Sequence, residues 1–126
     1  MATKKKTPTT KAEPATKLKN AKLNQHVFLA EMLADSYFPK HLVKKGQALL
    51  VALAAKIEAK APKGEAVYAL THATTEAFND LQEEFDEAES EIETAAREAI
   101  AGDIGFILET LGYEVDLEEA IAPRDW

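Results

Sequence analysis

The stretch PKHLVKKGQALLVALAAKIEAK, residues 39–60, decides the class of fold. Its large apolar residues fall at steps of three, four or seven, the spacing that places side chains on one face of an α-helix. They are Leu42, Leu49, Leu50, Leu53 and Ile57. Pro39 suits the first position of a helix, because its missing N–H costs nothing there. Pro62 and Gly64 follow as breakers, so the stretch predicts one long amphipathic helix.

The segments on either side carry the same helical pattern. Over 23–38, apolar residues at three- and four-residue steps predict a first helix, which Pro39 separates from the second. They are Phe28, Leu29, Met32 and Leu33. A third helix is predicted over 65–86, where one stripe holds Val67, Leu70, Phe78, Leu81 and Phe85.

A fourth helix is predicted to begin near Ser90. The sequence SEIE, residues 90–93, has the form of a capping box, in which Ser90 and Glu93 satisfy each other's backbone N–H groups. Its apolar face would be formed by Ile92, Ala96, Ile100, Ile104, Ile107, Leu108 and Leu111. Gly112 is placed to end this helix in a left-handed conformation. Asp116 and Glu119 resemble a second box that opens a short helix, stopped by Pro123.

These patterns together predict an all-α fold. Residues 23–126 should form an antiparallel bundle of about four helices plus a short C-terminal helix, because no window alternates with the period of a strand. The chain of 126 residues is 46% hydrophobic, enough for one core without disulfides, and it contains no Cys. The longest wholly apolar run, 48–55, is far shorter than the ~20 residues that span a bilayer. We therefore expect a cytoplasmic protein without a membrane segment.

The net charge of −7 is divided unevenly along the chain. Residues 1–22 hold seven Lys and one Glu, a net charge of +6, whereas 23–126 hold eight Lys or Arg and 21 Asp or Glu, a net charge of −13. The basic extension 1–22 is predicted to be disordered, because it cannot bury enough apolar area to offset its ordering entropy. It could solubilise the protein, contact nucleic acid without sequence specificity, or fold onto the acidic domain.

The densest acidic run is NDLQEEFDEAESEIE, residues 79–93, with eight carboxylates and neither Lys nor Arg. On the third helix Asp80, Glu83, Glu84 and Glu87 follow three- and four-residue steps and form one acidic stripe. A calcium loop is disfavoured, because such loops need a central Gly and none lies between 65 and 101. The stripe could be a solvated face, a surface for a basic partner, or a cation site.

His72 and Glu76 form the main candidate for polar chemistry. They lie four residues apart and can project from the same helical face, where they could bind a metal ion or move a proton. The structural alternative is a partly buried His that is hydrogen-bonded to a neighbour. No His has a Glu three residues before it, which disfavours a di-metal carboxylate site. Tyr37, at the junction of the first two helices, is the third candidate; it could face a ligand or wedge the hinge beside Phe38.

Three stretches resemble a known family: EMLADSYFPKHLV (31–43), YALTHATTEAFNDLQEEFDEAESEIETAAREAI (68–100) and IAPRDW (121–126). The resemblance is to small bacterial helical proteins classed as a domain of unknown function, and it covers about residues 23–126. It implies no activity and no catalytic residues. Where members are expected to have a Gly-containing turn before the SEIE box, this chain has EAES, which leaves open whether the third helix breaks there.

The functional expectation follows from what the sequence holds and lacks. The chain has no Cys, no glycine-rich phosphate loop, and only two serines, Ser36 and Ser90, both at expected helix caps. We therefore predict no catalytic residue, cofactor or metal, and a non-enzymatic module that presents its acidic face to a basic protein. The alternative is a small ligand- or metal-binding protein, or an enzyme, centred on His72 and Glu76. The terminal Arg124 and Trp126 are expected to pack on the bundle, or else to dock into a partner.

Overall fold

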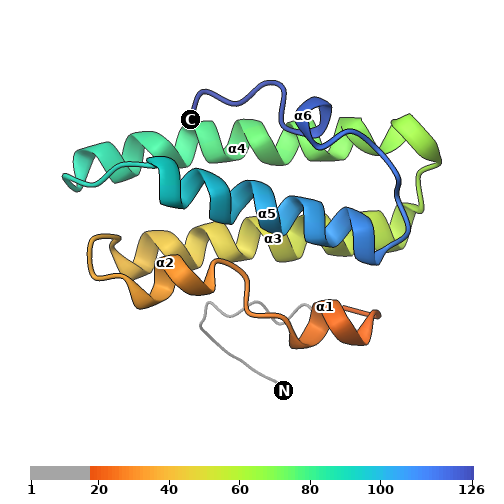
Figure 1. The fold of residues 1–126 in the computed structure, drawn as a ribbon, viewed down its shortest axis with the longest axis horizontal. Coiled ribbons are helices and arrows are strands. Elements are labelled where there is room, and N and C mark those ends of the chain that lie inside the picture. The colour runs from red at the N-terminus through yellow and green to blue at the C-terminus, as the bar shows by residue number, and fades with distance from the viewer. Residues whose placement is uncertain (1–17) are drawn as a thin grey trace, which may run out of the picture.

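The computed structural model describes residues 18–126, and this part of the chain contains helices and no strand (Figure 1). The elements in chain order are α1 (Ala21–Gln25), α2 (Ala30–Ala34), α3 (Lys40–Lys60), the 3₁₀ helix η1 (Gly64–Val67), α4 (Tyr68–Glu87), α5 (Thr94–Thr110) and α6 (Leu117–Ala120). The predicted all-α fold is confirmed. The predicted disorder of residues 1–17 lies outside the described residues. Residues 18–22, assigned to the same extension, are instead part of the folded domain, since Glu58 binds the N–H groups of Lys19 and Asn20 and α1 begins at Ala21. From Leu18, which is buried, the chain packs on the helices.

Three long helices form the body of the molecule. The helix predicted over 39–60 is confirmed as α3; α4 runs antiparallel to it, and α5 reverses direction again (Figure 1). The short helices α1 and α2 lie along α3 and α5 on one side, and α6 lies on α4 on the other. The apolar stripes of these helices meet in one continuous core, as periodicity predicts.

The predicted single helix over 23–38 is wrong, because the chain forms α1 and α2 with a break between them. Leu29, directly before α2, has a left-handed φ of 55°. The backbone at the break is bound by distant side chains: Asp103 Oδ2 accepts the Leu29 N–H at 2.7 Å, and Gln47 Nε2 donates to the Phe28 carbonyl at 2.8 Å. These tertiary bonds replace the intrahelical ones that a continuous helix would make.

The break between the third and fourth helices is real, but the predicted capping box is not formed. α4 ends at Glu87, the turn after it places Glu89 at a φ of 63°, and α5 begins only at Thr94. Ser90 is buried, and its Oγ donates to the Tyr37 carbonyl at 3.1 Å, so it ties this loop to the α2–α3 junction instead of capping α5. Glu93, the residue before α5, makes no side-chain cap.

The C-terminal segment is packed against α4. Asn79 binds it twice: its Nδ2 donates to the Pro123 carbonyl at 3.0 Å, and its Oδ1 accepts the Asp125 N–H at 2.8 Å. Trp126 is buried edge-on against Phe78, with 6.3 Å between ring centroids. These contacts agree with the packed-tail interpretation.

The predicted end of α5 at Gly112 is confirmed, whereas only half of the box predicted at Asp116 and Glu119 is formed, because the Asp116 N–H donates to the Tyr68 hydroxyl and not to Glu119. Gly112, which follows α5, has a φ of 89°. A residue with a Cβ would be strained in this backbone conformation, and Gly is not. Asp116 caps α6, since its Oδ1 accepts the Glu118 N–H at 3.0 Å.

Candidate functional site

His72 lies in the first turns of α4, and its hydrogen-bonding partner is in α6. Its Nε2 lies 2.7 Å from the Glu119 carbonyl oxygen and 3.8 Å from Glu119 Oε2. A carbonyl oxygen only accepts, so Nε2 carries the proton and donates it. The imidazole also stacks on Tyr68 at a centroid distance of 5.9 Å. This arrangement is that of a half-buried His that fastens α6 to α4.

The structure does not bring Tyr37, His72 and Glu76 together. Glu76 is exposed and has no hydrogen-bond or ion-pair partner among residues 18–126. Tyr37 lies at the far end of the bundle, because its carbonyl accepts from Ser90, just beyond the C-terminus of α4. The helix between His72 and Glu87 is itself about 22 Å long at 1.5 Å per residue. Tyr37, with 43% of its surface exposed, therefore belongs to a different part of the molecule.

A different set of residues surrounds His72. Glu65, Tyr68, Asp116 and Glu119 line an open cavity of about 370 Å³ beside it. The Tyr68 hydroxyl accepts the Asp116 N–H at 3.0 Å, which joins α4 to the loop before α6. Sequence reasoning missed this group, because the pair Glu65 and Tyr68 and the pair Asp116 and Glu119 lie about 50 residues apart in the chain and only the packing of α6 on α4 brings them together. Within residues 18–126, no three His, Asp or Glu side chains are grouped so as to hold a metal ion.

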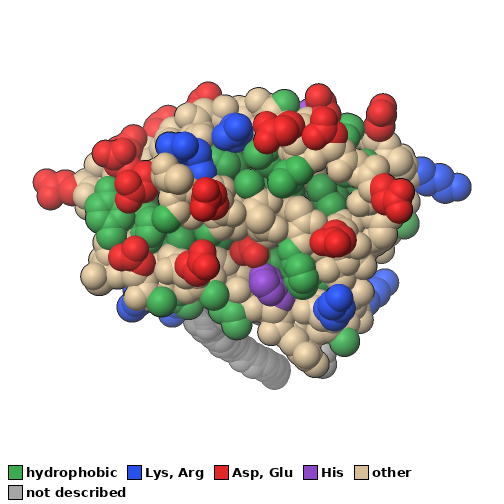
Figure 2. Space-filling model, in the orientation of Figure 1, with side chains coloured by type: hydrophobic (Ala, Val, Ile, Leu, Met, Phe, Trp, Pro, Cys, Tyr) green, Lys and Arg blue, Asp and Glu red, His purple; other side chains and the backbone are tan. Residues whose placement is uncertain are grey.

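The predicted acidic stripe on α4 is a surface. Asp80, Glu83 and Glu87 are exposed, and Glu84 is half-buried. Glu84 makes an ion pair with Lys45 of α3, with 2.6 Å between Oε1 and Nζ. The acidic character continues past α4: positions 76–98 hold ten Asp or Glu and one Arg. Figure 2 shows acidic side chains spread over the face formed by α4 and α5, where basic ones are fewer.

A partly buried polar pair, also unforeseen from the sequence, joins α5 to the break before α2. Asp103 Oδ1 lies 2.9 Å from His26 Nε2, and its other oxygen holds the Leu29 N–H. The His26 ring packs against Phe28 and Phe106, at centroid distances of 4.8 and 4.4 Å. His26 and Asp103 line an open cavity of about 290 Å³ between α2 and α5. The two residues are 77 positions apart, so no local pattern relates them.

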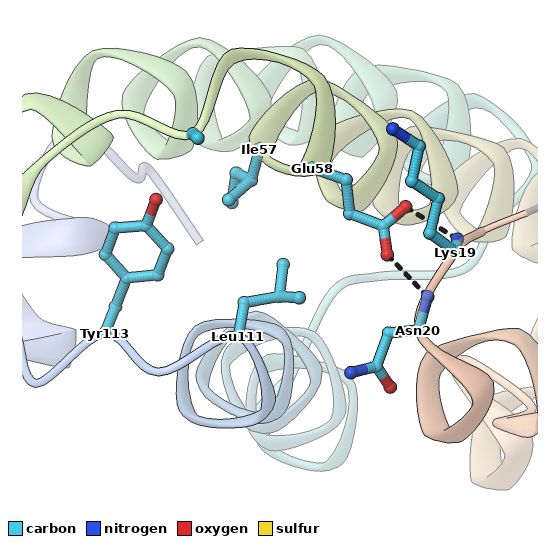
Figure 3. Close-up of a pocket in the computed structure, with 7 residues that line it drawn as sticks. Lys19, Asn20, Ile57, Glu58, Leu111 and Tyr113 are labelled. Atoms are coloured by element: carbon cyan, nitrogen blue, oxygen red, sulfur yellow. Dashed lines mark hydrogen bonds between the residues drawn. The ribbon is translucent and has the colours of Figure 1, made fainter.

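Another cavity, of about 400 Å³, lies where the described chain begins (Figure 3). Glu58 reaches across it, and its two oxygens accept the backbone N–H groups of Lys19 and Asn20, both at 2.8 Å. The rest of the lining is formed by Ile57, Ala61, Leu111 and Tyr113. The Tyr113 hydroxyl donates to the Pro62 carbonyl at 2.5 Å. Its polar side chains thus mainly hold the first described residues on α3.

None of the helices described has both the length and the apolar composition needed to cross a membrane. Comparison with known proteins finds one family: a model described as a family of unknown function (DUF5713) matches residues 22–126. This match confirms the resemblance to a small helical domain of unknown function. Neither a curated protein nor a solved structure matches the chain.

Proposed function

The chain belongs to this family of unknown function, and we propose that it is a non-enzymatic interaction module, which presents an acidic face to a basic protein partner. We define the acidic face as Asp80, Glu83, Glu84 and Glu87 of α4. The observation that carries the proposal is that Asp80, Glu83 and Glu87 are exposed and make no ion pair with a described Lys or Arg, while the half-buried Glu84 pairs with Lys45.

Fold stability does not account for this density of charge. Like charges three or four residues apart on one helix destabilise it by about 0.2–0.5 kcal/mol per pair. The one ion pair on the face, between Glu84 and Lys45, is exposed and contributes little at such a site. A negative surface steers a positive partner during diffusional encounter, so binding should weaken as salt increases.

The proposal is tested by affinity capture from a lysate of the source organism. Each retained protein is then purified, and its affinity for the chain is measured at low and high salt. Neutralising the acidic face with Asp80→Asn, Glu83→Gln, Glu84→Gln and Glu87→Gln should abolish salt-sensitive capture of a basic protein. The matched control neutralises four acidic residues elsewhere, Glu65, Glu109, Glu114 and Asp125, and changes the net charge equally. Equal binding by the two variants, or no salt-sensitive partner of the wild type, refutes the proposal.

A ligand site at His72 and Glu76 is the alternative. It is supported by the cavity of about 370 Å³ beside His72, lined by three carboxylates and Tyr68. It is weakened by the hydrogen bond from His72 Nε2 to Glu119, which occupies one of the two ring nitrogens. A thermal-shift screen of small molecules and metal ions, run on the wild type and His72→Ala, separates the two functions. Only a stabilisation that His72→Ala loses supports the alternative.

A further inference from the structure

The cavity of about 290 Å³ between α2 and α5 has the chemistry of a receptor for a basic side chain. Its lining includes His26, Val27, Ala30, Glu31, Glu98 and Gly102. Val27 is 56% exposed, one of only two large apolar side chains so exposed between residues 18 and 126. No Lys or Arg lines the cavity. It therefore combines an apolar wall with carboxylates that no lining cation neutralises.

Gly102 is the feature that packing within the chain does not explain. It lies inside α5, where Gly destabilises a helix relative to Ala. A Cβ placed on Gly102 would meet no atom within 4 Å, so no neighbour requires its absence. Gly46 of α3 is the contrast, because its Cβ would lie 2.8 Å from the Leu29 side chain. The space above Gly102 is thus left open at a cost in stability.

The carboxylates of the cavity differ in whether they already have a hydrogen-bond or ion-pair partner. Both oxygens of Asp103 already have partners, His26 Nε2 and the Leu29 N–H. These contacts hold the imidazole in place at the side of the cavity. Glu31 and Glu98 are exposed and have no hydrogen-bond or ion-pair partner among residues 18–126. A Lys or Arg side chain has an apolar stem and a cationic head, which complements an apolar wall beside free carboxylates.

We propose that this cavity receives a Lys or Arg side chain of the basic partner, with its stem over Gly102 and Val27 and its head paired with Glu31 and Glu98. The inference rests on the proposed function and extends it. The acidic face of α4 attracts the partner at long range, and the cavity anchors one of its residues. Charge complementarity and the open space at Gly102 are the two observations that select this occupant.

The test is an NMR titration of the full-length protein with N-acetyl-arginine amide and N-acetyl-lysine amide at low salt. We expect saturable shifts centred on the backbone amides of Ala30 and Gly102, with a dissociation constant on the order of 1 mM, as suits one side chain. N-acetyl-norleucine amide, which keeps the stem and lacks the charge, should cause no saturable shift. Shifts spread evenly over all acidic surfaces, or none, overturn the inference.

Variants separate the cavity from the general charge. Gly102→Leu fills the cavity without changing charge and should abolish the saturable shifts, whereas Gly102→Ala should retain them. Both replacements favour helix, so both should fold. Glu31→Gln with Glu98→Gln should weaken binding several-fold, while Glu83→Gln with Glu87→Gln should leave it close to wild type. Retained binding in Gly102→Leu refutes the cavity as the site.

The two proposals fail in different ways. If a basic partner is captured by the wild type, lost with the acidic face neutralised, and still bound by Gly102→Leu, the interaction module stands and the anchoring cavity is refuted. If the arginine derivative binds at Gly102 and no basic protein is captured, the cavity is a cation-binding site and the proposed function is refuted.

Discussion

Asp103 of α5 holds His26 in the segment before α2, with Asp103 Oδ1 at 2.9 Å from His26 Nε2, and its second oxygen binds the Leu29 N–H. One carboxylate thus fixes both ends of the break that divides the first predicted helix. Its side chain is only 14% exposed, so water cannot readily replace it. This contact decides how α1 and α2 attach to the three long helices.

Replacing Asp103 should therefore destabilise the protein substantially. Asp103→Ala leaves the Leu29 N–H and the imidazole without their partner, and we expect a loss of about 2–3 kcal/mol in the free energy of unfolding. Asp103→Asn, which keeps one acceptor, should cost less. Urea denaturation measures both. Glu98→Ala, exposed on the same helix, is the control and should change stability by about 0.5 kcal/mol or less; a similar loss there would contradict the assignment.

Gly46 of α3 and Gly102 of α5, both inside helices, should respond oppositely to replacement by Ala. At Gly46 the new Cβ would lie 2.8 Å from Leu29 Cδ1 and 3.1 Å from Phe78 Cε1, so overpacking of about 1–3 kcal/mol should outweigh the gain in helix propensity. At Gly102 nothing lies within 4 Å, and Ala should stabilise by up to about 1 kcal/mol. Thermal unfolding of the two variants checks this. Stabilisation by Gly46→Ala would show that Leu29 moves freely.

Asn79 should control the environment of Trp126. Asn79→Ala removes the two hydrogen bonds that hold Pro123 and Asp125, and we expect a loss of about 1–2 kcal/mol together with partial release of the tail. Trp126 is the only Trp in the chain, so its fluorescence reports on the tail directly and should shift to the red. Gln82→Ala, three residues further along α4, should leave the emission unchanged.

Ser90 and Glu93 distinguish the observed loop from a capping box. The structure predicts that Ser90→Ala costs about 1 kcal/mol, because the Tyr37 carbonyl loses its buried donor. Glu93→Ala should change stability by about 0.5 kcal/mol or less, since its side chain caps nothing. In a capping box both changes would destabilise. Comparable losses in the two variants would therefore contradict the loop geometry.

The sequence by itself determined the helices and several of their ends. The apolar steps over 39–60 predict α3, because each helical hydrogen bond and each facing pair of side chains joins residues three or four apart. The helix ends at Gly112 and Asp116 are also local features. The left-handed φ of Gly112 and the bond from the Glu118 N–H to Asp116 each involve only a few adjacent residues. The exposure of Asp80, Glu83 and Glu87 also follows from periodicity alone, opposite an apolar stripe.

The tertiary structure alone decided the contacts that override or complete these local preferences. The break at Leu29 depends on a carboxylate 74 residues away, Ser90 binds a carbonyl 53 residues away, and His72 finds its acceptor 47 residues on rather than at Glu76. Each such bond involves a group partly or fully removed from water, where leaving it unpaired costs about 1–3 kcal/mol. That is more than the few tenths that separate most local helix propensities, so the distant partner determines the local structure.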